Sequence, residues 1–374
     1  MSDTYTLYGM SASLYTGKVR AYLIHHGIPF EERGAGHPTF MADILPQLGR
    51  WIIPVVVTPD GTVLQDGTAI IDYFEAKELG RYSVIPSDPV ARSVAYIFEL
   101  FGGEGLLRPA MHYRWGFDAD NLDFLRVNFA EAFPAGLSPD QKAAMFEQSS
   151  GRMRKAGAAF GVSQETAPTI EETYKTFLGL LDAHFTATPY LLSDRASLGD
   201  YGLMNGLFAH LARDPHPALI MKRLAPAVFT WTERMNRPFG VVTNETAGSS
   251  EPHWDTLNPL MKFIADDFLS EIMAHTEFTR AWLDDDAPSM DKPIERSIGM
   301  CTVQWQGHQI QTAVMPYRHW LLQRLQDEFE TQPQKDQTRI HAHLTETGLN
   351  DLLGAKLPRR VERRGNREFW GSAS

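Results

Sequence analysis

In the first 80 residues, some segments have an apolar side chain at every second position, as in a strand, and others have apolar side chains at the spacing of a helix. Residues 4–9 alternate between polar and apolar side chains and are rich in Tyr, Thr and Leu, which predicts a β-strand. Residues 15–26 carry apolar side chains at the spacing of a helix, and Gly27 is a typical C-terminal stop. Residues 29–32 predict a second, short strand. The pattern therefore indicates a strand–helix–strand unit.

A hairpin and a further helix follow this unit. Residues 55–57 and 62–64 are apolar strands that flank residues 59–61, Pro-Asp-Gly, which favour a tight turn. Residues 68–78 return to helical spacing. A right-handed crossover would make the first two strands parallel. The sequence thus predicts a small α/β domain over residues 1–80.

The segment 89–240 shows only helical spacing and predicts an all-helical domain. Helices are expected at residues 89–115, 139–160 and 169–185. Ser197 and Asp200 have the spacing of a capping box, in which an N-cap residue and the residue three positions later bond to each other's main chain. An apolar stripe from Met204 to Leu211 follows, so this helix is expected to be deeply buried.

The last third of the chain contains both helical and strand-like spacing of apolar side chains. It predicts a helix at 257–282, a hairpin within 302–314 and a helix at 317–329. Five arginines then gather at positions 359, 360, 363, 364 and 367. Such a cluster is most often a solvated tail, and it could also dock on an acidic face of this chain or of a second copy. We predict a mostly helical extension over residues 250–374, whose role the sequence leaves open.

Composition narrows the class of protein. The chain has 374 residues with 43% hydrophobic side chains, enough for a full core, and a formal net charge of −11. Net negative charge argues against a general nucleic-acid binder, which needs clustered Lys and Arg. No apolar run reaches the roughly 20 residues of a membrane-spanning helix, and the start has no basic and apolar leader. We therefore expect a cytoplasmic protein with no membrane or nucleic-acid partner.

The sequence predicts no metal site. The single cysteine, Cys301, excludes a disulfide framework and a cysteine-based zinc cluster. His341 and His343 lie on different faces of a helix, with no further ligand to complete a set. Residues 284–286, three aspartates, lack the spacing of a calcium loop.

Motifs in the first domain resemble the glutathione S-transferase family. The strand 5–9, the polar loop 11–16 and the helix start 19–23 are similar to the opening of that family, and 51–56 with 64–73 are similar to its second half. The resemblance implies a thioredoxin-like N-terminal domain followed by the family's all-helical domain, including the buried capping box. It also implies glutathione as co-substrate and a homodimer. Residues beyond about 240 exceed the usual family length.

Ser13 is the first candidate for catalysis. The resemblance to the serine-type branches of the family, theta and zeta, implies that Ser13 holds the glutathione sulfur as a thiolate. A hydroxyl that donates to the sulfur anion contributes about 1–3 kcal/mol, or roughly one to two pKa units. Serine is equally favoured as a plain helix N-cap. Tyr15 is the second candidate, and Ser11 and Thr16 compete.

The resemblance also implies a glutathione-binding set. A cis peptide at Pro54 would turn the main chain of Ile53 outward to pair with glutathione, whereas an ordinary trans proline is the alternative. Asp66 would bind the ammonium of glutathione, and Thr68 with the main chain of Gly67 would hold its carboxylate. Gly67 departs from the family's serine because it has no hydroxyl. Plain helix capping is the alternative for Asp66.

Further residues are implied for the two ends of the site. His37 and Arg50 are candidates for the glycine carboxylate of glutathione, or are simply surface residues. His112, Tyr113 and Trp115 are candidates for the acceptor-substrate pocket. An aromatic stripe at helical spacing is more often core than pocket wall, so that alternative stays open.

The sequence therefore indicates a glutathione transferase in which the thiolate attacks a small hydrophobic electrophile. A glutathione-dependent lyase, dehalogenase or isomerase of the same fold is the first alternative, because the acceptor pocket decides the reaction. A non-catalytic binding or assembly module of this fold is the second alternative.

Overall fold

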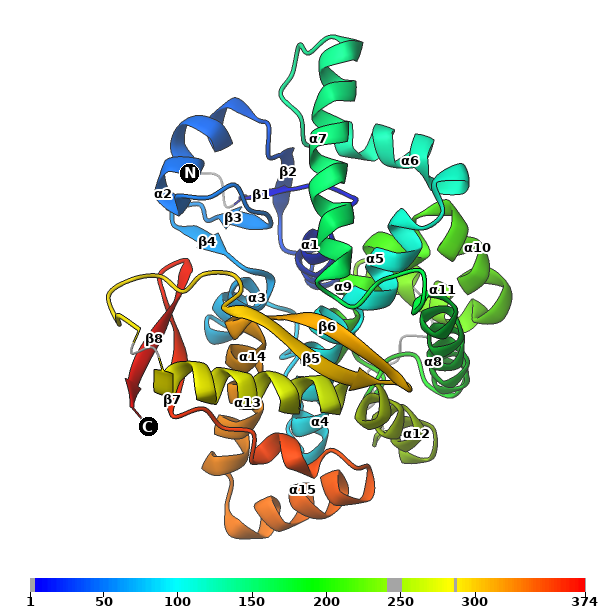
Figure 1. The fold of residues 1–374 in the computed structure, drawn as a ribbon, viewed down its shortest axis with the longest axis vertical. Coiled ribbons are helices and arrows are strands. Elements are labelled where there is room, and N and C mark those ends of the chain that lie inside the picture. The colour runs from blue at the N-terminus through cyan, green and yellow to red at the C-terminus, as the bar shows by residue number, and fades with distance from the viewer. Residues whose placement is uncertain (1–3, 241–250, 286–287, 374) are drawn as a thin grey trace.

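The computed structural model describes residues 4–240, 251–285 and 288–373, so Asp286 of the aspartate run lies outside the described residues. Figure 1 shows a small sheet domain, a set of helices beside it, and a C-terminal region that lies against both. One hydrophobic core cluster includes Leu7 of the sheet, Leu181 of the helical domain and Leu344 near the C-terminus. The C-terminal region is therefore part of the same folded body.

The N-terminal domain has a four-stranded sheet of order β2-β1-β3-β4. β1 is parallel to β2 and antiparallel to β3, and β3 pairs with β4 as a hairpin. This arrangement confirms the predicted thioredoxin-like domain. Its elements are β1 (Tyr5–Gly9), α1 (Leu14–His26), β2 (Phe30–Gly34), a π-helical turn (Phe40–Ile44), α2 (Leu45–Leu48), β3 (Val55–Val57), β4 (Val63–Gln65) and α3 (Gly67–Ala76).

The first helix ends where its sequence predicts. Gly27 has φ 66°, a left-handed conformation that costs glycine little, and its N–H bonds back to the last turn. On the other side, α1 packs against α9 (Leu198–Gly206), so α1 is buried between the sheet and the helical domain.

The helical domain contains the expected helices, and further helices at residues 118–130, 215–224 and 226–235 were not predicted. The predicted continuous helix 89–115 is divided by a π-helical turn, Phe101–Gly105. Gly102 approaches the main chain of α9 so closely that an added Cβ would lie 2.4 Å from the carbonyl carbon of Gly202. The π-helical turn therefore lies where this helix packs closely against α9. The helices are α4 (Pro89–Leu100), α5 (Leu107–Trp115), α6 (Asp118–Ala130), α7 (Pro139–Ala158), α8 (Ala167–Ala187), α9 with a π-helical end (Leu207–Ala212), α10 (Pro215–Leu224) and α11 (Pro226–Met235).

The predicted capping box is present at the start of α9. The carboxylate of Asp200 accepts the Ser197 N–H at 2.8 Å. The same buried carboxylate accepts the indole N–H of Trp231 and the main-chain N–H of Leu191, each at 3.0 Å. Asp200 therefore fixes a helix start, a loop and a tryptophan at one point in the core.

The C-terminal region confirms the predicted hairpin and helices but corrects the arginine tail. The five arginines lie in a β-hairpin, β7–β8, where strand pairing orders residues that the sequence favoured as solvated. The elements are α12 (Trp254–Ile264), a π-helical turn (Ala265–Leu269), α13 (Ser270–Asp285), β5 (Gly299–Trp305), β6 (His308–Val314), α14 (Pro316–Thr331), α15 (Gln334–Glu346), a 3-10 helix (Asn350–Leu353), β7 (Arg359–Arg364) and β8 (Arg367–Ala373).

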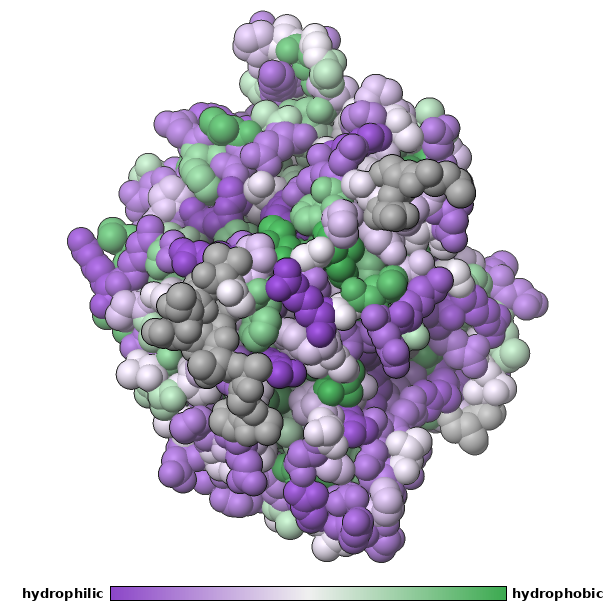
Figure 2. Space-filling view, turned by 180° about the vertical axis from the view of Figure 1, so that it is seen from behind, coloured by the Kyte–Doolittle hydropathy of each residue, from purple (hydrophilic) through white to green (hydrophobic). Residues whose placement is uncertain are grey.

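The face opposite to that of Figure 1 is mostly hydrophilic, with apolar side chains gathered near its centre (Figure 2). Among the described helices, none is long and apolar enough to span a membrane. Within residues 4–240, 251–285 and 288–373, no group of three or more His, Cys, Asp or Glu side chains is arranged to hold a metal ion.

Candidate functional site

Ser13 lies at the N-terminal end of α1 and is half-buried. Its Oγ accepts the N–H of Thr16 at 3.3 Å, so Ser13 is the N-cap of the helix. Because Oγ acts as an acceptor in that bond, its own proton stays available for a second partner. Main-chain N–H groups in a first helical turn have no intrahelical acceptor, and they add a partial positive charge beside this hydroxyl.

The segment before β3 lies next to the Ser13 loop. The Ile53–Pro54 peptide bond is cis, as the family resemblance implies. The side chain of Ile53 packs in the same apolar cluster as Met10 and Ala12, which lead into Ser13. Among the described residues, we find no hydrogen-bond partner for the main-chain N–H or C=O of Ile53. The structure therefore places a free main-chain edge beside a helix N-terminus with an available hydroxyl.

Tyr15 points elsewhere, into the interface between the domains. Its hydroxyl lies 3.5 Å from Glu104 Oε1, at the limit of a hydrogen bond. Burial, followed by the negative charge of Glu104, raises the pKa of the Tyr15 hydroxyl well above its usual value. Tyr15 is thus a neutral donor in a buried polar cluster, and its predicted role toward the glutathione thiol stays a prediction.

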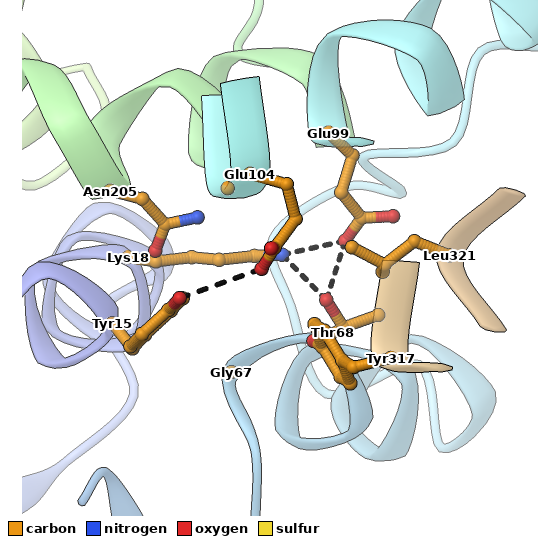
Figure 3. Close-up of a pocket in the computed structure, with 10 residues that line it drawn as sticks. Tyr15, Lys18, Gly67, Thr68, Glu99, Glu104, Asn205, Tyr317 and Leu321 are labelled. Atoms are coloured by element: carbon orange, nitrogen blue, oxygen red, sulfur yellow. Dashed lines mark hydrogen bonds and ion pairs between the residues drawn. The ribbon is translucent and has the colours of Figure 1, made fainter. Parts of the chain in front are cut away.

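That polar cluster encloses a small cavity between α1, α3, α4 and α14 (Figure 3). Lys18 Nζ donates to Glu99 Oε1 at 2.6 Å and to Thr68 Oγ1 at 2.8 Å, and Thr68 Oγ1 donates to Glu99 at 3.0 Å. Burial raises the pKa of Glu99, but Lys18 and Arg324 outweigh burial and lower it. The cavity volume of about 10 Å³ suits a single water molecule.

Sequence reasoning missed this cluster. Glu99 and Glu104 are acidic residues within an otherwise apolar helical stretch, which was the available signal. Their partners come from α1, α3 and α14, so the pairing depends on the tertiary structure. A cavity of this size and closure favours a structural role for the cluster.

Asp66 and Thr68 are engaged within the chain. Asp66 Oδ1 accepts the N–H groups of Thr68 and Ala69 at 3.0 Å, so Asp66 caps α3. Asp66 Oδ2 accepts the hydroxyl of Tyr317, from the C-terminal region, at 2.8 Å. The Thr68 hydroxyl faces the buried cluster, and Gly67 offers only its main chain. The roles of these three residues toward glutathione stay predictions, with the capping alternative present for Asp66.

The other two glutathione candidates lie apart. His37 Nδ1 accepts the N–H of Thr39 at 3.2 Å, within its own turn. Arg50 follows α2 in the chain, and its guanidinium donates to Gln65 Oε1 of β4 at 3.2 Å and to the carbonyl of Asn366 at 3.3 Å. Arg50 thus borders both the N-terminal sheet and the C-terminal hairpin.

The three acceptor-pocket candidates do not share one surface. Tyr113 is completely buried in the main core, so it has no surface for a substrate. His112 is buried with Nε2 3.2 Å from Glu171, and burial lowers the pKa of this imidazole. Trp115 packs in the cluster that contains Met10 and Ala12. Because successive helical residues turn by about 100°, only Trp115 faces the Ser13 side.

The C-terminal region reaches the same interface through a buried ion network. Arg318 Nε donates to Glu104 Oε2 at 3.0 Å, and its Nη1 forms a short contact with Glu271. Arg108 also pairs with Glu271. Burial alone would raise the pKa of Glu271, but Arg108 and Arg318 outweigh burial and hold it at about 2. The network therefore joins α13 and α14 to the helical domain.

Comparison with known protein families gives a match to the N-terminal part of the chain. A family model described as the glutathione S-transferase N-terminal domain matches residues 7–81. No curated protein matches the chain.

Solved structures that are similar to this chain include three with low identity. A glutathione S-transferase from Rhodospirillum rubrum F11 is 16% identical, with a TM-score of 0.40 over 67% of this chain and 98% of that chain. The beta-etherase LigF from Sphingobium sp. strain SYK-6 is 17% identical, with a TM-score of 0.43 over 62% and 94%. A glutathione S-transferase of Ceriporiopsis subvermispora in complex with glutathione is 18% identical, with a TM-score of 0.42 over 64% and 99%.

The matched segment coincides with the sheet of order β2-β1-β3-β4 and contains the cis peptide at Pro54. The helical domain and the C-terminal region lie beyond that match. Residues 7–81 therefore form a domain of the glutathione S-transferase N-terminal family.

Proposed function

We propose that this protein binds glutathione beside Ile53 and Pro54 and activates the glutathione thiol with the Ser13 hydroxyl. The observation that carries the proposal is the main-chain edge of Ile53, whose N–H and C=O have no partner among the described residues. An extended peptide can pair with such groups as an added strand. Glutathione is a tripeptide that suits this edge.

The chemistry follows from the position of Ser13. A free thiol of this type titrates near 8.5, so only a few per cent is thiolate at neutral pH. Ser13 Oγ accepts the Thr16 N–H and can therefore donate its proton to the sulfur anion. One such bond lowers the thiol pKa by about one to two units, and the N-terminus of α1 acts in the same direction. The thiolate then attacks an electrophilic carbon, a C–S bond forms, and the leaving group departs with the bonding electrons.

The acceptor substrate would lie against Trp115. This indole packs with the apolar residues before Ser13, and the guanidinium of Arg154 lies 4.8 Å from the centre of its ring. An apolar wall with one cation suits a small hydrophobic electrophile. Lyase, dehalogenase and isomerase reactions use the same thiolate, so profiling aryl halides, aryl ethers and maleyl compounds assigns the reaction class.

The test is a comparison of two serine N-caps. We expect Ser13→Ala to raise the pKa of the bound thiol by about one to two units and to lower kcat/KM about 10- to 100-fold at neutral pH. Thiolate absorbance and steady-state kinetics measure these effects. Ser138→Ala is the matched control, because Ser138 caps α7 with the same 3.3 Å geometry and lies on the surface. Full activity in Ser13→Ala would move thiol activation to another group.

A non-catalytic binding module is the second candidate. Two observations favour it: Asp66 is already bonded to three donors of its own chain, and the Thr68 hydroxyl faces the buried cluster. Calorimetric titration with glutathione separates the two candidates. Saturable heat supports the transferase, whereas no heat at millimolar glutathione favours the module.

A further inference from the structure

Three arginines meet at the end of β4, two of them from the C-terminal hairpin. Arg50 and Arg363 both donate to the side-chain oxygen of Gln65, at 3.2 and 3.4 Å. Arg363 also donates to the main-chain oxygen of Gln65 at 3.0 Å. Arg367 reaches Gly49, where an added Cβ would lie 3.6 Å from its Nη2. Two like charges therefore share one neutral acceptor, with a third beside them.

The three arginines carry more positive charge than the acidic side chains beside them balance. Glu368 forms a short contact with Arg363 and lies 3.6 Å from Arg50, so three positive charges face one paired carboxylate. No ion pair of Arg367 is found within the described parts of the chain. The Nε of Arg363 is buried without a hydrogen-bond partner, and that side chain is only 8% exposed. Asp66 acts on Arg50 from farther away and is already bonded to three donors.

Two other arginines of the hairpin have acidic partners of their own. Arg360 pairs with Asp327 at 2.8 Å, and Arg364 pairs with Glu362 at 2.9 Å. Arg363 and Arg367 instead reach residues of the N-terminal domain, Gln65 and Gly49. Burial lowers the pKa of Arg50, and the nearby Arg367 and Arg363 add to that effect while Glu368 opposes it. A partly buried surplus of positive charge is costly unless an anion completes it.

The cluster lies close to the candidate peptide edge. Gln65 pairs with Val55, which directly follows Pro54, so the guanidinium groups at Gln65 lie one strand away from the cis peptide. Asn366 fixes the hairpin there, because its Oδ1 accepts the Gln65 N–H at 3.0 Å and its Nδ2 donates to the Val63 carbonyl at 3.1 Å. The hairpin is therefore positioned by main-chain contacts and not only by charge.

We propose that the C-terminal hairpin completes the ligand site, with Arg367 and Arg363, together with Arg50, forming a subsite for a carboxylate of the bound peptide. This inference rests on the proposed function and names hairpin residues that the N-terminal domain cannot supply. Guanidinium groups match carboxylates with two parallel hydrogen bonds, which suits a peptide with a carboxylate at its end. The C-terminal region then selects anionic thiols over neutral ones.

The experiment is calorimetric titration of the full chain with glutathione and with glutathione diethyl ester. We expect Arg367→Gln to weaken glutathione binding about tenfold, Arg367→Lys to restore part of it, and the wild-type affinity to fall as salt rises. The ester, which has no free carboxylate, is expected to bind weakly and equally to both proteins. Arg360→Gln is the matched control, because Arg360 lies in the same hairpin but pairs with Asp327 instead of reaching the N-terminal domain, and circular dichroism checks the fold of each variant.

The outcomes separate this inference from the proposed function. Glutathione binding that is equal in wild type, Arg367→Gln and Arg363→Gln overturns the subsite and leaves the transferase intact. If wild type does not bind glutathione, the proposed function fails, and titration with inorganic phosphate at constant ionic strength decides the subsite. Phosphate binding that is lost in Arg367→Gln supports the subsite, and phosphate binding that is absent or unchanged in the variant overturns it.

Discussion

At the scale of single residues, two candidate site residues are also helix N-caps. Ser13 caps α1 through its acceptor oxygen and keeps a proton to donate, so capping and thiol activation are compatible. Asp66 differs, because the main chain of α3 and Tyr317 together use both of its oxygens. An N-cap residue therefore remains able to bind a ligand at Ser13, whereas at Asp66 both carboxylate oxygens are already used within the chain.

A buried histidine, His26, makes the free energy of unfolding depend on pH. Burial, with the nearby His25 and Arg81 acting in the same direction, lowers the pKa of His26 to about 3. Between about pH 3 and the unfolded value near 6.5, the unfolded chain binds a proton that the folded chain does not. The free energy of unfolding therefore falls as pH falls through this window, by up to about 1.4 kcal/mol per pH unit from this group.

His26→Asn tests this contribution. His26 Nδ1 accepts the N–H of Arg81 at 3.0 Å, and the asparagine oxygen can replace that acceptor without titrating. We expect urea unfolding measured from about pH 4.5 to 7.5 to give a flatter profile than wild type. The exposed His341→Asn is the control and should leave the profile unchanged. An unchanged slope in His26→Asn would contradict the assignment.

At the scale of elements, single side chains decide how helices start and meet. Asp200 joins the start of α9, the loop at Leu191 and Trp231 of α11 through one carboxylate. Burial raises the pKa of this carboxyl, while the hydrogen bonds it accepts oppose that shift. The capping box thus anchors a junction between elements as well as one helix end.

We expect Asp200→Ala to lower the free energy of unfolding by about 2–5 kcal/mol, because it leaves several buried donors without an acceptor. Chemical denaturation measures this loss. Asp140→Ala is the matched control, since Asp140 lies in the exposed first turn of α7. A loss below about 1 kcal/mol in Asp200→Ala would mean that the cap is not a junction.

At the scale of the whole molecule, the C-terminal region is held by charge as well as by apolar packing. Arg318 of α14 links Glu104 of the helical domain to Glu271 of α13, and all three side chains are only 2% exposed. Removing one partner of such a network leaves a buried uncompensated charge. The predicted homodimer stays a prediction at this scale, and light scattering of the full chain measures it.

Arg318→Leu is expected to lower the free energy of unfolding by about 3–5 kcal/mol and to loosen α13 and α14 first. Denaturation and amide hydrogen exchange measure both effects. Arg360→Leu, which breaks the exposed pair with Asp327, should cost about 1 kcal/mol or less. Equal effects of the two variants would show that the buried network does not hold the C-terminal region.

Several features were predictable from the sequence because they depend on near neighbours along the chain. The strands of the first domain, the stop at Gly27, the hairpin of β3 and β4, and the capping box of Ser197 and Asp200 all follow from local spacing and turn residues. The cis peptide at Pro54 followed from the family resemblance and not from the residues alone.

Other features depended on which surfaces the folded chain brings together. The interruption of the helix at residues 101–105 goes with the close approach of α9 to Gly102. The partners of Lys18 and Asp66, and the placement of Arg363 beside Gln65, join residues far apart in sequence. The sequence by itself determined the strands and helices of the N-terminal domain and its family resemblance, because periodicity and turns are set within a few residues. Only the tertiary structure decided which charges meet. An ion pair needs two surfaces in contact, and the sequence around one charged residue does not show which distant residue will lie opposite it.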